Sequence, residues 1–450
     1  MASTHIIGRQ NIRLRYQGRM DPLALQQIVS QVCREELPER LSDLFDRYDD
    51  KDKVLRLGKL EVNIVLTSDA NLQEQLSKAI VSAVAQALQQ QLEARVTEAL
   101  SLERSFTRLL CFYLEQGYLP WWALRKDPQV FKQKLKEQLQ EDNLKQLVRE
   151  VLPVLHQYDA RCRLLALLDD ASFERFIAAS GFWPEQEWQA WKALKEMLGR
   201  QVPQAAFESF FRQAVLEAST PGASRTGKLA ALLVQKFKQL QGHITVRHLD
   251  AIQNTSIRNA LRAALSGEKP SAEIPQTLPS ETPSPNESIH IRNAGLILLA
   301  PFLPAFFARL GLLEAGLLQD GSHGISLLRY LVFGAGDFDE MEVPLEKVLC
   351  GLALSESLEK GRQLSAFEKQ EADSLLASVI THWEVLKNTS PNGLRYNFLQ
   401  REGRLAFKEN LWEVAVQKQS HDILLDYLPW SISMIKLPWM PQLLAVKWNS

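Results

Sequence analysis

A proline-rich segment at 266–288 constrains the fold of this 450-residue chain more than any other feature. It reads SGEKPSAEIPQTLPSETPSPNES, with five prolines and few apolar side chains. Proline fixes φ and lacks a backbone N–H, and a stretch poor in apolar residues cannot form a core. We therefore expect an extended, poorly ordered linker here. Because 450 residues also exceed what one hydrophobic core supports, we expect separate domains on either side.

The region before residue 67 has the pattern of strands that alternate with helices. Residues 5–16 alternate apolar and polar side chains, as a half-buried strand does. A second alternating run covers 54–66 and changes phase at Gly58, where a bulge is the expected device. Between the two runs, the spacing predicts a helix over 23–37 that ends before Pro38. Together with the helix that follows, this predicts a strand-helix-strand-helix module.

That following helix is predicted over 71–100 and carries an apolar residue at every fourth position. Four residues advance about 400° on a helix with 3.6 residues per turn, so the stripe rotates by about 40° at each step. The helix must therefore bend, break or meet several partners. Two interpretations remain open, which are packing inside one monomer and contact with neighbouring copies or a surrounding wall. The stripe consists of Leu72, Leu76, Ile80, Val84, Leu88, Leu92, Val96 and Leu100.

The rest of the chain is predicted to be helical up to the linker and mixed after it. Helices over 101–265 are interrupted near 115–122 and 179–188, where we expect tryptophans to plug helix ends rather than to form a ligand platform. After the linker, Ser365 and Glu368 form a possible capping box, and 404–417 reads as a hairpin. The fold class is thus α+β and predominantly helical. The expected domains are an α/β module at 1–100, a helical domain at 101–265, the linker at 266–288 and an α+β domain at 289–450.

Charge and cysteine content favour protein partners and a reducing compartment. The formal net charge is -1, so no overall field attracts nucleic acid or an anionic membrane. The four cysteines are far apart and form no CxxC pair. The opening residues lack the apolar core of a secretory signal, so we expect the protein to begin in the cytoplasm. The apolar stretch 294–318 is interrupted by Arg309 and Glu314, which favours buried helices over a membrane span.

Two motifs resemble ligand-binding loops, but each lacks residues that such a loop needs to bind its ligand. GASRTGK at 222–228 has the GxxxxGK spacing of a phosphate-binding loop, but Leu229 replaces the hydroxyl that holds magnesium, and a helix is expected before it instead of a strand. We interpret it as an interhelical turn. GAGDFDE at 334–340 places three carboxylates after two glycines but lacks the ligand spacing of a calcium loop. A solvated turn is the expected structure.

Catalytic and metal-binding signatures are also not recognisable. The eight histidines include no HExxH motif and no Cys/His group with zinc spacing, and His243 and His248 have no apparent third ligand. The sequence contains no GxSxG elbow. We therefore expect a protein that is not an enzyme and that uses no cofactor or metal.

Several blocks of the sequence together resemble the contractile injection system tape measure family. Shorter blocks, IIGRQNIRLRY, LRLGKLEVNI and GYLPWW, extend the resemblance toward the start, so it covers nearly the whole chain. The longest blocks are RNAGLILLAPFLPAFFARLGLL (292–313), VPLEKVLCGL (343–352), HWEVLKNTSPNGLRYNFLQREGRL (382–405) and DILLDYLPWSISMIKLPWMPQLLAVKW (422–448).

The resemblance implies a non-enzymatic assembly protein of a phage-tail-like particle, one that helps to set the length of the inner tube and sheath. Its partners would be tube, baseplate or cap proteins. Self-association is left open, and from the charge and the interrupted apolar stretch we expect no nucleic acid and no stable membrane insertion. It would act in the cytoplasm during assembly, and its presence in the released extracellular particle is left open. The candidate motif or interaction positions are Asn293, Pro301, Pro304, Trp383, Asn388, Pro391, Gly393, Pro429, Trp430, Pro438, Trp439 and Trp448.

The length of the chain limits a literal ruler. As one helix, 450 residues would reach roughly 675 Å, but the strands and the linker exclude that form. Three compact domains of about 40 Å and a linker of about 70 Å give roughly 190 Å. A longer trunk could be measured only if the domains open or several copies stack. An assembly adaptor or chaperone is therefore the alternative, and a cargo toxin or hydrolase is a more remote one.

Overall fold

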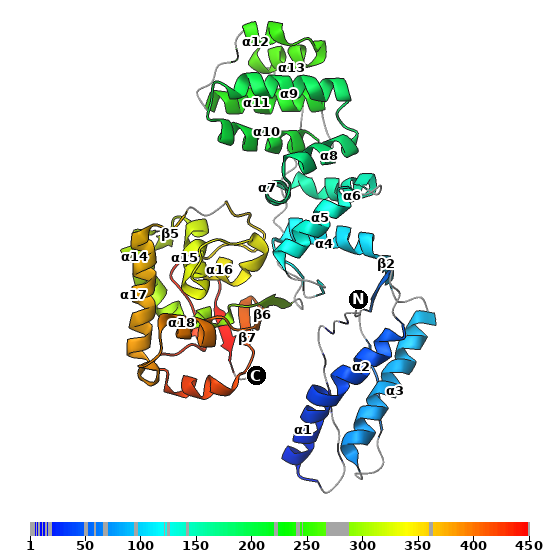
Figure 1. Cartoon of the computed structure of the whole chain (residues 1–450), viewed down its shortest axis with the longest axis vertical. Helices are drawn as coiled ribbons and strands as arrows, with labels where there is room; N and C mark the ends of the chain where they lie inside the picture. Colours follow the sequence, from blue (N-terminus) through cyan, green and yellow to red (C-terminus); the bar gives the residue numbers. More distant parts are fainter. Residues whose placement is uncertain are drawn as a thin grey trace. The chain divides into compact units, whose positions relative to one another are not determined.

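The computed structural model of the chain shows two compact units, Met1–Arg108 and Leu109–Ser450 (Figure 1). The predicted fold class, a predominantly helical α+β protein, is confirmed. The structure describes residues 5, 7, 10, 12, 13, 16, 20–48, 53–57, 60–65, 71–93, 98–120, 122–123, 127–140, 144–219, 224–239, 244, 246–266, 288–359 and 363–448. The proposed linker therefore lies almost entirely outside the described residues.

The first unit is built around a helical pair. Its long arm runs from α1 through a π-helical turn into α2 and packs on α3. The predicted stop before Pro38 is wrong, because proline in the first turn of a helix forfeits no hydrogen bond and α2 begins there. The elements are α1 (Pro22–Gln31), η1 (Val32–Glu36), α2 (Leu37–Asp46) and α3 (Leu72–Glu93).

The stripe at every fourth position is buried within this unit for half of its length. Leu76, Ile80 and Val84 join the core formed with the α1–α2 arm, and Leu88 is buried as well. The helix predicted to residue 100 is wrong at 98–100, which form part of a strand, and 94–97 lie outside the described residues.

Strands in this unit are shorter than predicted. β1 (Lys53–Arg56) pairs antiparallel with β2 (Glu98–Ser101), which takes the place of the predicted helix end. Positions 57 and 60–65 carry no strand, and the predicted bulge at Gly58 lies outside the described residues. The described positions of the run 5–16 also carry no strand, and the others lie outside the described part.

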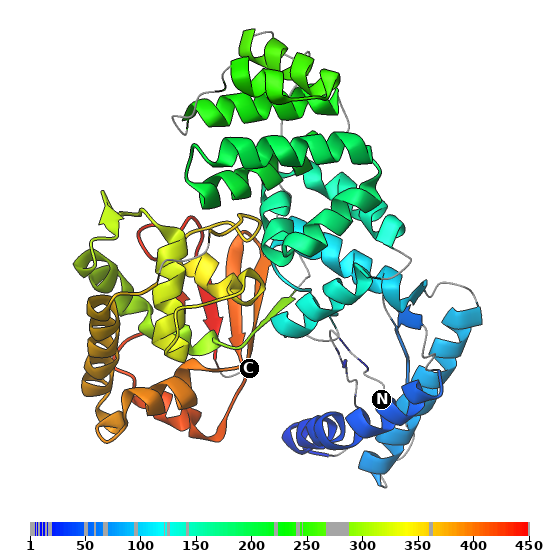
Figure 2. The same cartoon turned by 45° about the horizontal axis from the view of Figure 1, so that its top comes forward.

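The helices that follow form a stack of neighbouring layers (Figures 1 and 2). Gly117 and Gly181, both with positive φ, follow α4 and α8 and allow the chain to turn sharply. Trp183, Trp188 and Trp191 are buried between these helices, which confirms their predicted packing role. The elements are α4 (Leu102–Gln116), α5 (Pro128–Gln138), α6 (Leu144–Val151), η2 (Leu152–His156), α7 (Tyr158–Leu167), α8 (Asp170–Ser180), α9 (Glu185–Gly199), α10 (Gln204–Ala218), α11 (Arg225–Gln239), α12 (Val246–Ala251) and α13 (Thr255–Ser266).

Helices pack against a small mixed sheet in the last part of the chain. The strand order is β3-β6-β7-β9-β8, antiparallel except for the parallel pair β7–β9. The strands are β3 (Ser288–Ile291), β4 (Leu313–Glu314), β5 (Leu317–Leu318), β6 (Gly403–Lys408), β7 (Leu411–Val416), β8 (Met434–Ile435) and β9 (Leu444–Lys447). The helices are η3 (Ala294–Phe302), α14 (Leu303–Arg309), α15 (Gly321–Phe333), η4 (Glu340–Glu342), α16 (Pro344–Leu349), α17 (Ala366–His382), η5 (Glu384–Leu386), α18 (Pro391–Leu394), η6 (Arg395–Leu399) and η7 (Ser420–Tyr427).

Three local predictions for this part are confirmed. The capping box of Ser365 and Glu368 begins α17. The predicted hairpin is β6–β7, whose turn is at Glu409 and Asn410. The apolar stretch 294–318 is not a span but packs into the core, with Leu296–Leu299 fully buried. Among the described residues, no helix has the length and apolar character needed to cross a membrane.

Candidate interaction sites

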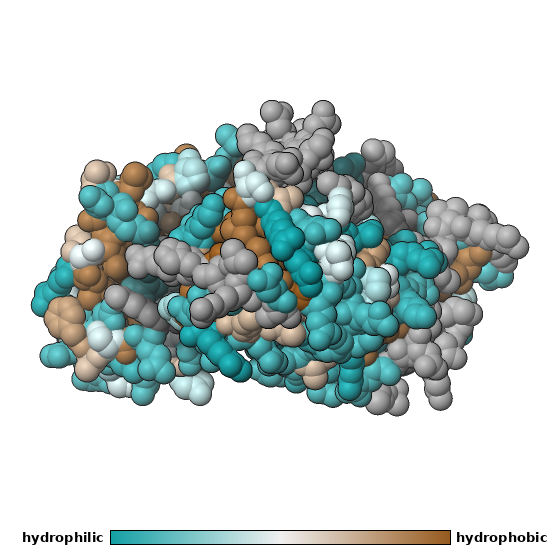
Figure 3. Space-filling view, turned by 90° about the horizontal axis from the view of Figure 1, so that it is seen from above, coloured by the Kyte–Doolittle hydropathy of each residue, from teal (hydrophilic) through white to brown (hydrophobic). Residues whose placement is uncertain are grey.

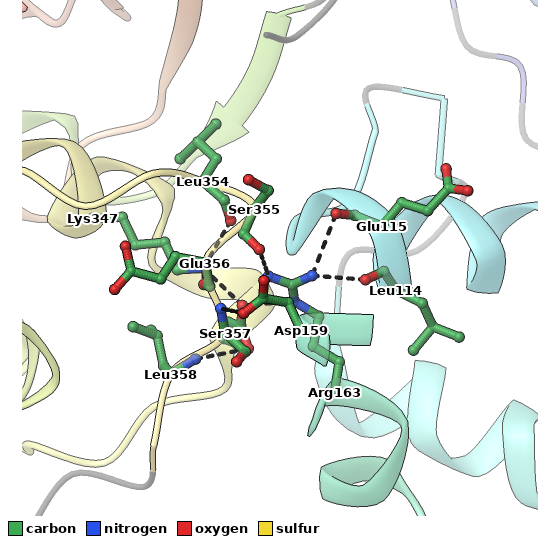
Figure 4. A network of polar contacts seen from close by, with 11 residues as sticks. Leu114, Glu115, Asp159, Arg163, Lys347, Leu354, Ser355, Glu356, Ser357 and Leu358 are labelled. Carbon is green, nitrogen blue, oxygen red and sulfur yellow. Dashed lines mark hydrogen bonds and ion pairs between the residues drawn. The ribbon is translucent and has the colours of Figure 1, made fainter. Parts of the chain in front are cut away.

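Arg163 on α7 joins the helical stack to the mixed sheet region of the second unit (Figure 4). Its side chain is fully buried. Nη1 donates to the backbone oxygen of Leu114 at 2.7 Å, near the end of α4. Nε donates to Glu340 Oε1 at 2.8 Å and Nη2 to the backbone oxygen of Ser355 at 2.5 Å. One guanidinium therefore binds two segments that lie far apart in the sequence.

Lys347 on α16 binds Glu340, the carboxylate that Arg163 also contacts, from the side of the C-terminal sheet region. Its Nζ donates to Glu340 Oε1 at 2.7 Å and to the backbone oxygens of Leu354 and Glu356 at 2.8 and 2.5 Å. Burial lowers the pKa of Lys347 to about 8, against the opposing effect of Glu340. The charged pair is thus supported by backbone carbonyls, which a buried ammonium group needs in place of water.

Three further contacts surround the Arg163 network. Asp159 Oδ1 accepts a hydrogen bond from the backbone N–H of Ser357 at 2.8 Å. Lys132 on α5 forms an ion pair with Asp339. Tyr118, in the turn after α4, is buried in the hydrophobic core of the sheet region. The turn that contains Tyr118 therefore supplies an apolar anchor beside the polar contacts.

The structure corrects the solvated turn predicted for GAGDFDE. Gly334 ends α15 with a positive φ and Asp337 is exposed, as a turn requires. Asp339, however, is half-buried and Glu340 is largely buried, and they pair with cations of α5, α7 and α16. Local sequence cannot show these partners because Arg163 lies 177 positions away from Glu340. Within the described ranges, no group of three or more His, Cys, Asp or Glu side chains could hold a metal ion.

GASRTGK does not form a phosphate-binding loop in its described part. Thr226, Gly227 and Lys228 lie in the first turn of α11, and α10 precedes them, so the interhelical turn predicted through Lys228 ends earlier. Lys228 Nζ donates to the backbone oxygen of Glu217 at 2.9 Å. Gly222 and Ala223 lie outside the described residues, as does His243. His248 contacts the side chain of Gln201.

The predicted tryptophan positions are built into the interior of the sheet region. Trp383, Trp430 and Trp439 donate their indole N–H groups to the backbone oxygens of Leu424, Leu298 and Leu349. Pro301, Asn388, Pro429 and Pro438 are exposed, Pro304, Pro391 and Gly393 are half-buried, and Asn293 and Trp448 are buried. As interaction positions, these residues stay predictions.

Trp448 belongs to a second buried charge cluster. Arg401 and Asp422 form a two-pronged ion pair, with Nη–Oδ distances of 2.7 and 3.0 Å. The Arg401 guanidinium also lies 5.4 Å from the centre of the Trp448 ring. Burial alone would raise the pKa of Asp422, but hydrogen bonds from Arg401 and from the Gln419 backbone hold it below its ordinary value. This cluster fixes the last strand to the turn after η6.

Glu346 on α16 is a fully buried carboxylate without a close ion pair. Arg329 Nη1 lies 3.9 Å from its Oε1, and Arg329 also faces Glu342 at 3.6 Å. Burial raises the pKa of Glu346 to about 6 from 4.5. Its ionised form is therefore unfavourable in the folded protein, and its contribution to stability is lost as the pH rises through about 6.

Replacement of Glu346 by glutamine is expected to stabilise the protein at neutral pH. A pKa shift of this size corresponds to about 2 kcal/mol, which the neutral amide recovers at pH 7.5 but not at pH 4.5. Urea unfolding at both values measures the difference. Glu342→Gln is the matched control and should bring no gain at pH 7.5, because Glu342 pairs with Arg292 and Arg329. A Glu346→Gln variant that is less stable at pH 7.5 would contradict the expectation.

Comparison with known proteins identifies one family. A family model described as contractile injection system tape measure protein matches residues 4–448. The resemblance of the sequence blocks is thereby confirmed over nearly the whole chain. No curated protein matches the chain, and no solved structure does.

Proposed function

Because the chain belongs to the contractile injection system tape measure protein family, we propose that it sets the length of the tube and sheath during particle assembly. The observation that carries this proposal is the extent of the family match, which includes both compact units. The protein would act through contacts with tube, baseplate or cap proteins and without catalysis.

Exposed apolar side chains of the sheet region are the proposed contact surface. On the face shown in Figure 3, most side chains are hydrophilic, and hydrophobic ones are seen both at the left end and in the middle. Large exposed apolar groups of this kind are typical of protein contacts when they lie close together. η5 and η7 pack on one another and carry three of them. The exposed residues are Leu317, Phe367, Val385, Tyr396, Ile423, Tyr427, Met434 and Leu443.

An assembly adaptor or chaperone is the second candidate function. It is favoured by the division of the chain into two compact units rather than one extended rod. Compact units of this size can contact tube or baseplate subunits without spanning a long trunk. A cargo toxin or hydrolase is the remote alternative, and turnover by the purified protein would be required to support it.

Changes in the length of the proline-rich segment distinguish a ruler from an adaptor. Deletion of ten residues within 267–287 is expected to shorten particles by about 30 Å per extended copy, since each residue spans at most roughly 3.5 Å. Electron microscopy of particles from cells with the altered gene gives the length distribution. A variant with the same segment in scrambled order is the control and should leave the length unchanged. Unchanged length with fewer particles after the deletion would favour the adaptor.

A further inference from the structure

We infer that Arg163 holds together a contact within the second unit that can open and close again. This contact, called the latch below, consists of Arg163 with Glu340 and Ser355 and the Lys347 that supports them. The helical part is defined as residues 109–266 and the C-terminal part as residues 288–448. The inference is that these parts separate at the Arg163 network while each stays folded. It concerns the purified protein and does not depend on the length-setting role.

Each part has a hydrophobic interior of its own. The core of the C-terminal part contains buried residues from Ile289 to Trp448. Among its described buried members, Tyr118 alone comes from the helical part. The helical part has a separate interior around Trp183, Trp188 and Trp191. Separation would therefore expose Tyr118 and its surroundings but would leave both cores covered.

The groups that Arg163 binds on the C-terminal part keep other partners after it leaves. Glu340 retains Lys347 at 2.7 Å and the backbone N–H of Leu358 at 3.4 Å. Lys347 also retains its two backbone acceptors. On opening, the carbonyl of Ser355 and the guanidinium itself would become hydrated. Asp339 loses Lys132 on opening, but its side chain is already 26% exposed. Opening therefore leaves no fully buried charge alone in the C-terminal part, which is the usual reason that a buried ion pair resists separation.

Charge complementarity favours reclosure of the latch. Among the paired side chains, the helical part contributes Arg163, Lys132 and Asp159, which carry a net positive charge. The C-terminal part contributes Glu340, Asp339 and Lys347, which carry a net negative charge. Opposite charges across a contact guide encounter and fix its register. A polar contact of this type resembles those between domains that move relative to one another.

Arg163→Met in the full-length protein tests the latch, with Arg161→Met as the matched control. Both arginines are buried on α7, but Arg161 binds Glu217 and the backbone oxygens of Leu155 and His156, all within the helical part. Hydrogen exchange followed by mass spectrometry is the readout. Arg163→Met should accelerate exchange of the Ser357 amide about tenfold or more and leave 296–300 protected. Arg161→Met should accelerate exchange near 152–156 and not at Ser357.

A second variant opens the latch without removing a charge. A Cβ at Gly117 would lie 2.5 Å from the backbone oxygen of Leu354 and 2.9 Å from Glu340 Oε1, so Gly117→Ala should act as a wedge. It should expose the Ser357 amide as Arg163→Met does. The inference is overturned if Ser357 stays protected in both variants. It is also overturned if either variant loses protection throughout the C-terminal core, because the two parts would then be inseparable.

Discussion

Gly295→Ala is expected to destabilise the C-terminal part by about 3 kcal/mol or more, at the upper end of the effects of overpacking. A Cβ at this position would lie 1.6 Å from the backbone oxygen of Phe398 and 2.8 Å from Cα of Leu399. Both are main-chain atoms of η6, so no side-chain rotation can relieve the clash. The neighbouring hydrogen bond from the Ala294 N–H to the Arg401 oxygen holds the two segments together at 2.9 Å.

Gly324→Ala is the matched control for this prediction. Gly324 is also buried, within α15, but its Cβ would meet the side chains of Leu318 and Cys350 at 3.1 and 3.2 Å. Side chains can shift by a few tenths of an ångström, and alanine favours a helix over glycine by roughly 1 kcal/mol. Urea unfolding followed by tryptophan fluorescence should show a large loss in the free energy of unfolding for Gly295→Ala and little change in it for Gly324→Ala. Equal stability of the two variants would contradict the close approach of η3 and η6.

Local spacing predicted the features that depend on nearby residues. The capping box of Ser365 with Glu368, the β6–β7 hairpin and the buried stretch at 294–318 are confirmed because each arises from a few adjacent positions. The stripe was predicted through Leu100; it is buried at Leu76, Ile80, Val84 and Leu88, and the helix prediction failed at 98–100, which belong to β2.

The Arg163 network could not be predicted in the same way. The acceptors of Arg163 at Leu114, Glu340 and Ser355 lie 49 to 192 positions away from it, and no spacing rule connects them. A weaker signal does exist, because Arg163 lies three residues after Ala160 and four before Leu167, both of which face the interior. A charged residue at a core position of a helix indicates a buried partner. The identity of that partner follows only from the tertiary structure.

Arg401→Met is expected to lower the free energy of unfolding by about 3–5 kcal/mol, because it leaves Asp422 buried without its cation. The side chains of Arg401 and Asp422 are only 1% and 3% exposed. In the native protein the lowered pKa of Asp422 contributes stability above its ordinary value of 3.8, and this contribution is lost as the pH falls. Without Arg401, burial should raise the pKa of Asp422 instead. The deficit of the variant should therefore be large at pH 7 and smaller at acidic pH.

Two companion variants separate the lost ion pair from lost packing. Arg401→Met combined with Asp422→Leu removes both charges and should recover much of the deficit, since apolar replacement of a buried pair is often neutral. Arg404→Met is the exposed control on β6 and should change stability by no more than about 0.5 kcal/mol. Urea unfolding at pH 5 and pH 7 measures all three. If the double variant were as unstable as Arg401→Met at both pH values, the guanidinium would act through its contact with Trp448 and the Gln417 carbonyl at 2.7 Å rather than through its charge on Asp422.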